Sequence, residues 1–178
     1  IISVGELHHI KGYDRMLNIL KEVLYDLKTS NLPIDFHYHI VGDGSERYNL
    51  IELQKQLSLD NRITFHGHVK DAFKIIKDFD IFIMPSRSEA LAFALLEAYN
   101  AGTEIIASNV GGLTEVVENA NHGTLLDFEN IFEARNVIVS KITSIYINRI
   151  KGMYEKPSPM IIFPLQKMLR ETESVYNK

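Results

Sequence analysis

Two glutamates with seven residues between them, Glu89 and Glu97, are the side chains whose type and spacing first suggest chemistry. A short apolar run that ends at Pro85 precedes them, and a stretch with helical periodicity begins at Phe93. We therefore expect Glu89 in a loop after a strand and Glu97 just over one turn into the next helix. A helix N-terminus attracts phosphates and hydroxyls, and one carboxylate can accept two hydroxyls. The pair would then hold a sugar at one end and a ribose at the other, unless Glu97 is an ordinary surface residue and Glu89 only caps the helix.

Lys11 and Gly12 lie between the first apolar run and the first helical stretch, where a lysine can reach a diphosphate and a glycine lets the backbone turn tightly. Two further glycine-containing turns, 42–44 and 111–112, follow later apolar runs and would allow a ligand to approach the backbone closely. A lysine that is merely solvated, and turns that serve packing alone, would explain the same residues.

The seven histidines raise the hypothesis of a metal site, but their spacing does not favour one. Most of them form three close pairs without the helical i, i+4 placement of a zinc site and without a cysteine partner: His8/His9, His37/His39 and His66/His68. Strand alternation would direct His37 and His39 to one face, where a covering helix would make one of them a hydrogen-bonded core group. We expect no metal ligand among them.

Strand-length apolar runs alternate with helix-period stretches over most of the chain, and this pattern predicts an α/β fold with a Rossmann-like parallel sheet flanked by helices on both faces. The expected strands are Ile1–Gly5, Phe36–Val41, Ile63–Phe65, Ile81–Met84, Ile105–Ala107 and Gly123–Leu126. The expected helices are Tyr13–Lys28, one capped by Ser45 and ending near Leu57, Asp71–Phe79, Phe93–Ala101, one from Gly111 to about Asn119, and Asn130–Ile147. Ligands of such sheets bind beyond the carboxyl ends of the strands, near the point where the strand order reverses.

Composition limits the classes of protein to consider. The chain has 178 residues, of which 46% are hydrophobic and 24% charged, as in an ordinary globular domain. The net charge of -4 argues against a general nucleic-acid binder. The absence of cysteine excludes disulfides and favours a reducing, cytoplasmic setting, and no apolar run approaches the roughly 18 residues of a membrane span. Because the first residue is an isoleucine with strand character, we interpret the chain as a domain cut from a longer protein.

Taken in order, these segments resemble the carboxyl-terminal, donor-binding domain of the group-one retaining GT-B glycosyltransferases. The resemblance covers about residues 1–145 and keeps the family's order and spacing. Its most specific part is the frame of the two glutamates, with Pro85-Ser86 before it and Ala101-Gly102 after it. The other matching strings include Ser3-Val4-Gly5, Lys11-Gly12, Ile40-Val41-Gly42-Asp43-Gly44, Ile63-Thr64-Phe65-His66-Gly67, Ile106-Ala107-Ser108, Gly111-Gly112-Leu113-Thr114-Glu115 and His122-Gly123-Thr124-Leu125-Leu126.

The resemblance implies roles for individual residues. Lys11 would contact the donor diphosphate and Glu89 the hydroxyls of the donor sugar, and these are the two expected catalytic residues. Glu97 would hold the ribose, and the loop around Gly67 would border the base. The remaining donor-binding positions would be Gly5, Gly42, Leu91, Ala92 and Phe93. The substrate would be a UDP-, GDP- or ADP-sugar whose sugar is transferred with retained anomeric configuration, without a cofactor and without a metal.

Three positions depart from the family pattern. Glu6 replaces the arginine that usually follows the first-strand glycine, and at about 6 Å it would repel a diphosphate by about 2–3 kcal/mol per charge at an effective dielectric of about 20. Ala90 and Ala92 replace glycines, and each adds a Cβ where a sugar approaches. These departures favour a non-catalytic partner subunit as one alternative to an enzyme, and half of a sugar-nucleotide epimerase is another.

The chain is accordingly divided into a nucleotide-sugar-binding domain, 1–145, and a segment, 146–178, that contains an irregular stretch with prolines and a terminal crossover helix at Gln166–Tyr176. The amino-terminal, acceptor-binding half would be absent from this chain. The acceptor would be a glycan or glycolipid of polysaccharide biosynthesis. Contact with the inner face of a membrane would come only through the missing half.

Overall fold

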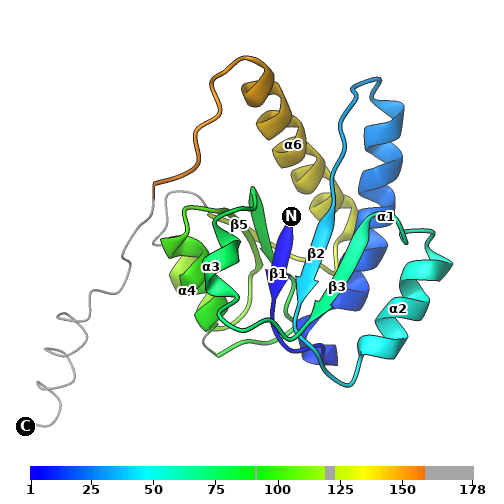
Figure 1. The fold of residues 1–178 in the computed structure, drawn as a ribbon, viewed down its shortest axis with the longest axis vertical. Coiled ribbons are helices and arrows are strands. Elements are labelled where there is room, and N and C mark those ends of the chain that lie inside the picture. Colours follow the sequence, from blue (N-terminus) through cyan, green and yellow to red (C-terminus); the bar gives the residue numbers. More distant parts are fainter. Residues whose placement is uncertain (91, 119–122, 159–178) are drawn as a thin grey trace, which may run out of the picture.

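The computed structural model describes residues 1–90, 92–118 and 123–158, and its centre is a six-stranded sheet (Figure 1). The strands run in the order β3-β2-β1-β4-β5-β6, and all neighbouring pairs are parallel. This confirms the predicted Rossmann-like parallel sheet. Their bounds are β1 (Ile2–Val4), β2 (Tyr38–Val41), β3 (Ile63–Gly67), β4 (Ile81–Met84), β5 (Glu104–Ser108) and β6 (Gly123–Leu126).

The strand order reverses between β1 and β4, which are neighbours although β2 and β3 come between them in the sequence. Ile2 of β1 is opposite His39 of β2 on one side and Phe82 of β4 on the other. The connections after β1 and β4 therefore lead to opposite halves of the sheet, and the part of the carboxyl edge between these two loops, called the crevice below, is where such sheets bind ligands. A ligand of this fold is expected in that crevice.

Helices cover both faces of the sheet. One layer consists of α1 (Tyr13–Thr29), α2 (Arg47–Gln56) and α6 (Ile131–Ile150), and the other of α3 (Phe73–Ile76), α4 (Phe93–Asn100) and α5 (Gly112–Glu118). In the first layer α1 packs against both α2 and α6, and Figure 1 shows these helices on one side of the sheet with α3 and α4 on the other. Each layer buries its own apolar cluster. None of the helices in the described ranges is long and apolar enough to cross a bilayer.

Helix α1 forms because apolar side chains recur at helical spacing, and Leu20 and Val23 are among those fully buried against the sheet. Each such side chain stabilises the fold by about 1.5–3 kcal/mol. The helix begins directly after Gly12, whose left-handed backbone (φ 68°) takes the chain out of a short 3-10 turn, His9–Lys11. Packing of α1 therefore fixes its N-terminus, and Lys11 beside it, at the carboxyl edge of the sheet.

Two predicted helix boundaries are wrong. Ser45 is not a helix cap, since it lies in a turn and α2 begins only at Arg47, without a side-chain cap bond. The helix predicted over Asp71–Phe79 is regular only across the four residues of α3, because the first residue of that range has a left-handed φ of 58° and turns flank the helix. In the first place a polar residue was mistaken for a helix cap, and in the second the apolar spacing of Phe73, Ile76 and Phe79 extends over more residues than the helix itself.

Other elements extend beyond their predicted ends. Strand β3 continues to Gly67, and α6 continues to Ile150, so the domain boundary predicted at residue 145 falls inside a helix. The terminal helix predicted at Gln166–Tyr176 lies outside the described residues, and the division of the chain stays a prediction.

The pairing between β2 and β3 contains a bulge-like irregularity. Ile40 is opposite Phe65, but the next residue, Val41, is opposite Gly67, so His66 is skipped. The bulge lies near the carboxyl end of β3, which is one of the two outer strands of the sheet.

Candidate functional site

The loops after β1 and β4 meet across the crevice, and they carry Lys11 and Glu89. The backbone N–H of Arg87 donates to the carbonyl oxygen of Ile10 at 2.7 Å, which joins the two loops. The Lys11 ammonium and the Glu89 carboxylate form an ion pair with 2.5 Å between Nζ and Oε2. The Glu89 side chain is 12% exposed and that of Lys11 28%. Two residues that are 78 positions apart in the sequence are thus in contact where the strand order reverses.

A second ion pair, between Asp14 and Arg87, joins the same two segments. Nη1 and Nη2 of Arg87 each donate to one carboxylate oxygen of Asp14 at 2.7 Å, and Nη1 also donates to the carbonyl oxygen of His9 at 2.8 Å. Burial would raise the pKa of Asp14, but the hydrogen bonds and charge of Arg87 outweigh it and hold that pKa below its usual value. The charge of Arg87 is therefore already matched within the protein.

Arg15, in the first turn of α1, bonds to the loop after β4 and to the segment after β6. Its Nε and Nη2 donate to the carbonyl oxygen of Pro85 at 3.1 and 2.7 Å, and its Nη1 pairs with Glu129 at 2.6 Å. Nη2 also lies 3.4 Å from Ser108 Oγ. Because only 10% of the Arg15 side chain is exposed, we infer that it positions the loops after β1, β4, β5 and β6 relative to one another.

Two glycines let other loops approach the Glu89 segment closely. Gly12 has a φ of 68°, and a Cβ there would lie 2.0 Å from the carbonyl oxygen of Pro85. Gly111 has a φ of 50°, and a Cβ there would lie 2.0 Å from the carbonyl oxygen of Glu89, to which the N–H of Gly112 donates at 3.1 Å. The protein's own backbone fills the space that these glycines leave, which favours the packing explanation for both.

The predicted binding glycines Gly5, Gly42 and Gly67 lie side by side at the ends of β1, β2 and β3. The N–H of Gly42 donates to the carbonyl oxygen of Gly67 at 2.8 Å, and a Cβ on Gly42 would lie 1.9 Å from the carbonyl oxygen of Gly5. Next to Gly67 are two charged side chains, Arg47 and Asp43, whose nearest atoms lie 3.5 and 3.9 Å from an ideal Cβ. The structure thus gathers the three glycines in one row, and their binding role stays a prediction.

The phenol of Tyr13 lies beside Gly5 at the carboxyl end of β1, and no role was predicted for it from the sequence. Its side chain is buried, and its hydroxyl would be 3.1 Å from a Cβ on Gly5. Burial, followed by the charge of Glu89, raises the pKa of Tyr13 far above its usual value. The hydroxyl therefore stays protonated beside the carboxyl end of β1.

Helix α4 places Glu97 at a distance from the ion pair. Glu97 is half-buried, and burial raises its pKa. Phe93, at the start of the helix, is 71% exposed, whereas Ala92 before it is buried; Leu91 lies outside the described residues. Glu97 borders a hollow of about 300 Å³ between α3 and α4, together with Phe73, Lys74, Lys77, Asn100 and Ala101. The roles of Glu89 and Glu97 at two ends of a ligand stay a prediction.

The three departures from the family pattern differ in their effect on the structure. Glu6 is exposed at the carboxyl edge, and neither nearby cation pairs with it, because Lys11 pairs with Glu89 and Arg15 with Glu129. Ala92 has a φ of -105°, and Ala90 is not among the described non-glycine residues with positive φ. Both alanines therefore fit the backbone without strain.

Three histidines, His37, His39 and His66, make side-chain hydrogen bonds near the surface of the sheet. His39 lies on β2 and His37 just before it, outside the strand, with ring centroids 4.7 Å apart, and both are half-exposed, so the predicted core position is wrong. Nδ1 of His39 lies 2.9 Å from Nε2 of His66, and Nε2 of His37 lies 2.8 Å from Thr64 Oγ1. Burial and neighbouring positive groups lower the pKa of His39 to about 4. Within residues 1–90, 92–118 and 123–158, no three His, Asp or Glu side chains converge on a metal position.

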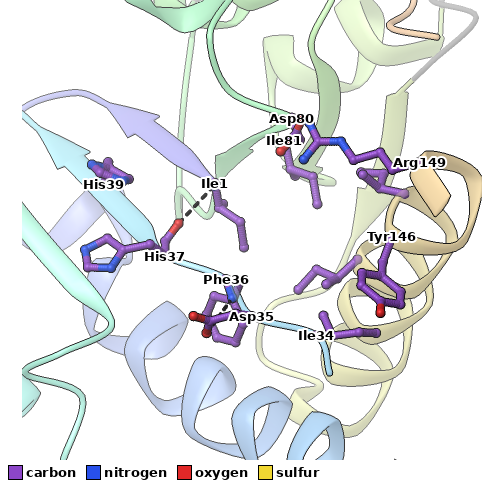
Figure 2. Close-up of a pocket in the computed structure, with 12 residues that line it drawn as sticks. Ile1, Ile34, Asp35, Phe36, His37, His39, Asp80, Ile81, Tyr146 and Arg149 are labelled. Carbon is purple, nitrogen blue, oxygen red and sulfur yellow. Dashed lines mark hydrogen bonds and ion pairs between the residues drawn. The ribbon is translucent and has the colours of Figure 1, made fainter. Parts of the chain in front are cut away.

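A hollow of about 280 Å³ lies at the opposite, amino edge of the sheet (Figure 2). Figure 2 shows Ile1, Ile81 and the stretch from Ile34 to His37 around it, and its charged residues already have partners: Asp80 pairs with Arg149, and Asp35 with Arg62. The carboxyl ends of α1 and α6 point to this edge, and their partial negative charge disfavours an anion. The amino-edge hollow is therefore a poor site for a phosphate-bearing ligand.

A protein-family model described as glycosyl transferases group 1 matches residues 1–151. The chain belongs to the group 1 glycosyl transferases. This result confirms the family that the ordered motifs indicated, and it covers all six strands and helix α6.

Individual proteins similar to this group 1 glycosyl transferase agree with that family. An uncharacterized glycosyltransferase of Haemophilus influenzae is 31% identical over 134 residues, which cover 75% of this chain and 36% of that protein. The O-antigen biosynthesis glycosyltransferase WclY of Escherichia coli is 29% identical over 183 residues, which cover 98% of this chain and 45% of that protein. The chain thus spans less than half the length of these relatives.

Among solved structures, Anabaena HepE in complex with UDP and glucose has the same fold. Its TM-score is 0.70 at 22% identity, and the match covers 98% of this chain and 48% of that one. The predicted fold class, the carboxyl-terminal half of a GT-B glycosyltransferase, is therefore confirmed.

Three residues that organise the crevice of this group 1 glycosyl transferase, Asp14, Arg15 and Arg87, were missed by sequence reasoning. The signal that would have found them is positional. Arg87 is two residues before Glu89 in the same loop, and Asp14 and Arg15 lie in the first turn of α1, at the same edge of the sheet. Charged residues at such positions face one another once the strand order is known.

Proposed function

We propose that this chain is the donor-binding half of a glycosyltransferase that moves a sugar from a nucleotide sugar to a glycan or glycolipid acceptor, with retention of the anomeric configuration. The observation that carries the proposal is the contact of Lys11 with Glu89 in the crevice between β1 and β4. An ammonium group suited to a diphosphate and a carboxylate suited to sugar hydroxyls lie there within one ligand's reach. The fold shared with a protein crystallised with UDP and glucose supports a nucleotide sugar as the ligand class.

In the proposed reaction the bond between the anomeric carbon and the diphosphate oxygen breaks, a bond to the acceptor hydroxyl oxygen forms, and the hydroxyl proton leaves with the diphosphate. Negative charge grows on the diphosphate as the first bond breaks. Lys11 and the N-termini of the helices at this edge stabilise that charge electrostatically. Glu89 orients the sugar through its hydroxyls, Glu97 holds the ribose beside α3, and Gly67 borders the base. No cofactor or metal is part of the proposal.

The acceptor would bind to a second, amino-terminal half of the enzyme, since this chain spans 36% and 45% of the two relatives described above. We propose that the complete enzyme acts in the cytoplasm and contacts the inner face of a membrane only through that other half. The mechanism above concerns only what this chain's own residues contribute.

Calorimetric titration of the chain with UDP, GDP and ADP, and with UDP-glucose, GDP-mannose and ADP-glucose, tests the proposal. We expect weak binding of one nucleotide class and no transfer of sugar, because an open crevice does not exclude water from the reacting atoms. Glycosyl transfer by the chain alone, measured by mass spectrometry of the products, would contradict the half-enzyme proposal.

Glu6 supports one second candidate, a non-catalytic partner subunit. Its carboxylate is exposed at the edge where the diphosphate would bind, and no cation among the described residues near it is free to offset the charge. Absence of binding for all three nucleotide classes, in a chain shown by circular dichroism to be folded, would favour this candidate over the enzyme.

A further inference from the structure

The ion pair between Lys11 and Glu89 has a consequence for ligand binding, which rests on the proposed function. In that function Lys11 serves the diphosphate and Glu89 serves the sugar, yet in the structure each is the partner of the other at 2.5 Å. A ligand that takes one of the two side chains therefore deprives the other of its partner.

Apart from Lys11, few groups near Glu89 offset the negative charge of its carboxylate. Its side chain is 12% exposed, and within residues 1–90, 92–118 and 123–158 the one other hydrogen-bonding contact of its carboxylate is the Ser86 hydroxyl at 3.5 Å, which is long for a hydrogen bond. A carboxylate in such surroundings is destabilised when it loses its cation, because desolvation is no longer offset.

The two neighbouring arginines, Arg15 and Arg87, are already paired with other groups. Arg87 makes two hydrogen bonds of 2.7 Å to Asp14, and Arg15 is divided between the carbonyl oxygen of Pro85 and Glu129. Neither arginine is therefore available to replace Lys11 beside Glu89, whereas sugar hydroxyls are groups from which a carboxylate readily accepts hydrogen bonds.

We propose that Lys11 and Glu89 exchange partners in every catalytic cycle, so that the site distinguishes a sugar-bearing donor from a bare nucleoside diphosphate. In the empty site the two charges neutralise each other. A nucleotide sugar brings a diphosphate for Lys11 and hydroxyls for Glu89, and so both keep a partner. A nucleoside diphosphate brings a partner for Lys11 alone.

The exchange favours release of the spent nucleotide. Once the sugar has been transferred, Glu89 has lost its hydroxyl partners, and Lys11 is drawn back to it from the diphosphate. The pair therefore competes with the product for the same ammonium group. Enzymes of this kind gain turnover when the product binds less tightly than the donor, because product release often limits the rate.

The test is the substitution Glu89→Gln, with binding of the nucleoside diphosphate and of the matching nucleotide sugar measured by calorimetry. Because the amide no longer holds Lys11, we expect the nucleoside diphosphate to bind about three- to tenfold more tightly. The nucleotide sugar should bind about tenfold more weakly, because hydrogen bonds to a charged acceptor are lost. The matched control is Glu52→Gln, which removes the same charge from an exposed Lys–Glu pair of 2.9 Å on α2 and should change neither affinity.

Simple repulsion between Glu89 and the diphosphate would also tighten nucleotide binding in Glu89→Gln, and the Lys11→Met background separates the two causes. Repulsion alone predicts the same gain with and without Lys11. Partner exchange predicts that most of the gain disappears in Lys11→Met, because there is no ammonium left to release.

Several results would overturn the exchange while leaving the proposed function intact: nucleoside diphosphate binding that is unchanged or weaker in Glu89→Gln, or an equal gain in the Lys11→Met background. If neither the unmodified chain nor Glu89→Gln binds any nucleotide, the proposed function itself fails and the exchange fails with it. Should Glu89→Gln unfold, the same comparison is made with Glu89→Ala, for which the gain in nucleoside diphosphate affinity and the loss of donor affinity are again expected to have opposite signs.

Discussion

The two edges of the sheet both contain ion pairs, but they differ in which helix ends lie beside them. Each edge has at least one acid–base pair, Lys11–Glu89 and Asp14–Arg87 at the carboxyl edge and Asp80–Arg149 at the amino edge. At the carboxyl edge helix N-termini converge on the crevice, whereas at the amino edge helices end with their carbonyl groups. The field of the helix ends therefore favours an anion at one edge and opposes it at the other.

This comparison shows that a hollow by itself does not identify a binding site. The amino-edge hollow of about 280 Å³ is close in volume to the one of about 300 Å³ beside Glu97. Other features select the carboxyl edge: the reversal of strand order, the direction of the helices and the loops that follow the strands. The predictions below set a change at one edge against a matched change at the other.

The largest effect is expected from Gly12→Ala at the carboxyl edge. A left-handed alanine costs about 1–2 kcal/mol, and its Cβ would meet the carbonyl oxygen of Pro85 at 2.0 Å. We expect the free energy of unfolding to fall by at least about 3 kcal/mol in urea denaturation, since backbone must move as well. The matched variant at the amino edge is Gly152→Ala, which has nearly the same φ (65°) but no atom within 4 Å of the Cβ. Equal losses in the two variants would show that the close approach at Gly12 contributes nothing.

The next effect is on nucleotide affinity. Glu97→Ala should weaken binding by about 1.5–3 kcal/mol, the contribution of hydrogen bonds to a charged group, in calorimetric titration. Asp80→Ala removes the acid of the amino-edge pair and should leave nucleotide affinity unchanged, although it loses its contacts with Arg149 and Tyr154. If Asp80→Ala weakened binding and Glu97→Ala did not, the assignment of the ligand to the carboxyl edge would be wrong.

A smaller gain is expected from Glu6→Arg. The substitution replaces repulsion with a charge-assisted contact to the diphosphate, and affinity should rise at least about tenfold at low salt, or about 1.4 kcal/mol. Added salt should reduce the gain, because exposed charges are screened. Glu155→Arg makes the same change of charge at an exposed position away from the crevice and should have no effect. An unchanged nucleotide affinity in Glu6→Arg would indicate that the side chain at this position points away from the ligand.

The smallest effect is expected from Asp14→Asn. Because the folded pKa of Asp14 lies below its usual value of 3.8, its pair with Arg87 stabilises the fold above that value and ceases to do so as the pH falls through the folded pKa. The pair is partly exposed, so we expect a loss of at most about 1 kcal/mol at neutral pH and no loss near pH 2. Urea denaturation at both pH values measures it. A loss that is the same at both pH values would mean that the contact is not ionic.

The fold was predictable because its signals are local and repeated. Apolar runs such as Ile81–Met84 and the helical spacing in α1 fixed the alternation of strands and helices, and the connection rules of parallel sheets placed the loops at one edge. Lys11 and Glu89 were chosen separately, as loop residues after different strands. Their contact was not predicted, because it spans 78 positions and depends on the order of the strands.

Tertiary packing decided the details that the sequence did not predict. The polar side chain of Ser45 has the type of a helix cap, but the turn before α2 places it outside the helix. His37 and His39 are spaced as residues on one face of a strand would be, yet β2 begins only at Tyr38 and both histidines are half-exposed. Arg15 belongs to no sequence motif, and its role in positioning the loops follows only from its hydrogen bonds to the carbonyl oxygen of Pro85.

The bulge between β2 and β3 bears on how the chain behaves when it is concentrated. An outermost strand presents unpaired N–H and carbonyl groups, and a flat, regular one invites another chain to pair with it and form aggregates. Bulges bend and twist the strand that contains them, so the register shift at His66 disfavours extension of the ladder by a second molecule near the end of β3. We expect that removing the bulge, by deleting His66, makes the chain more prone to self-association, and light scattering during concentration measures this.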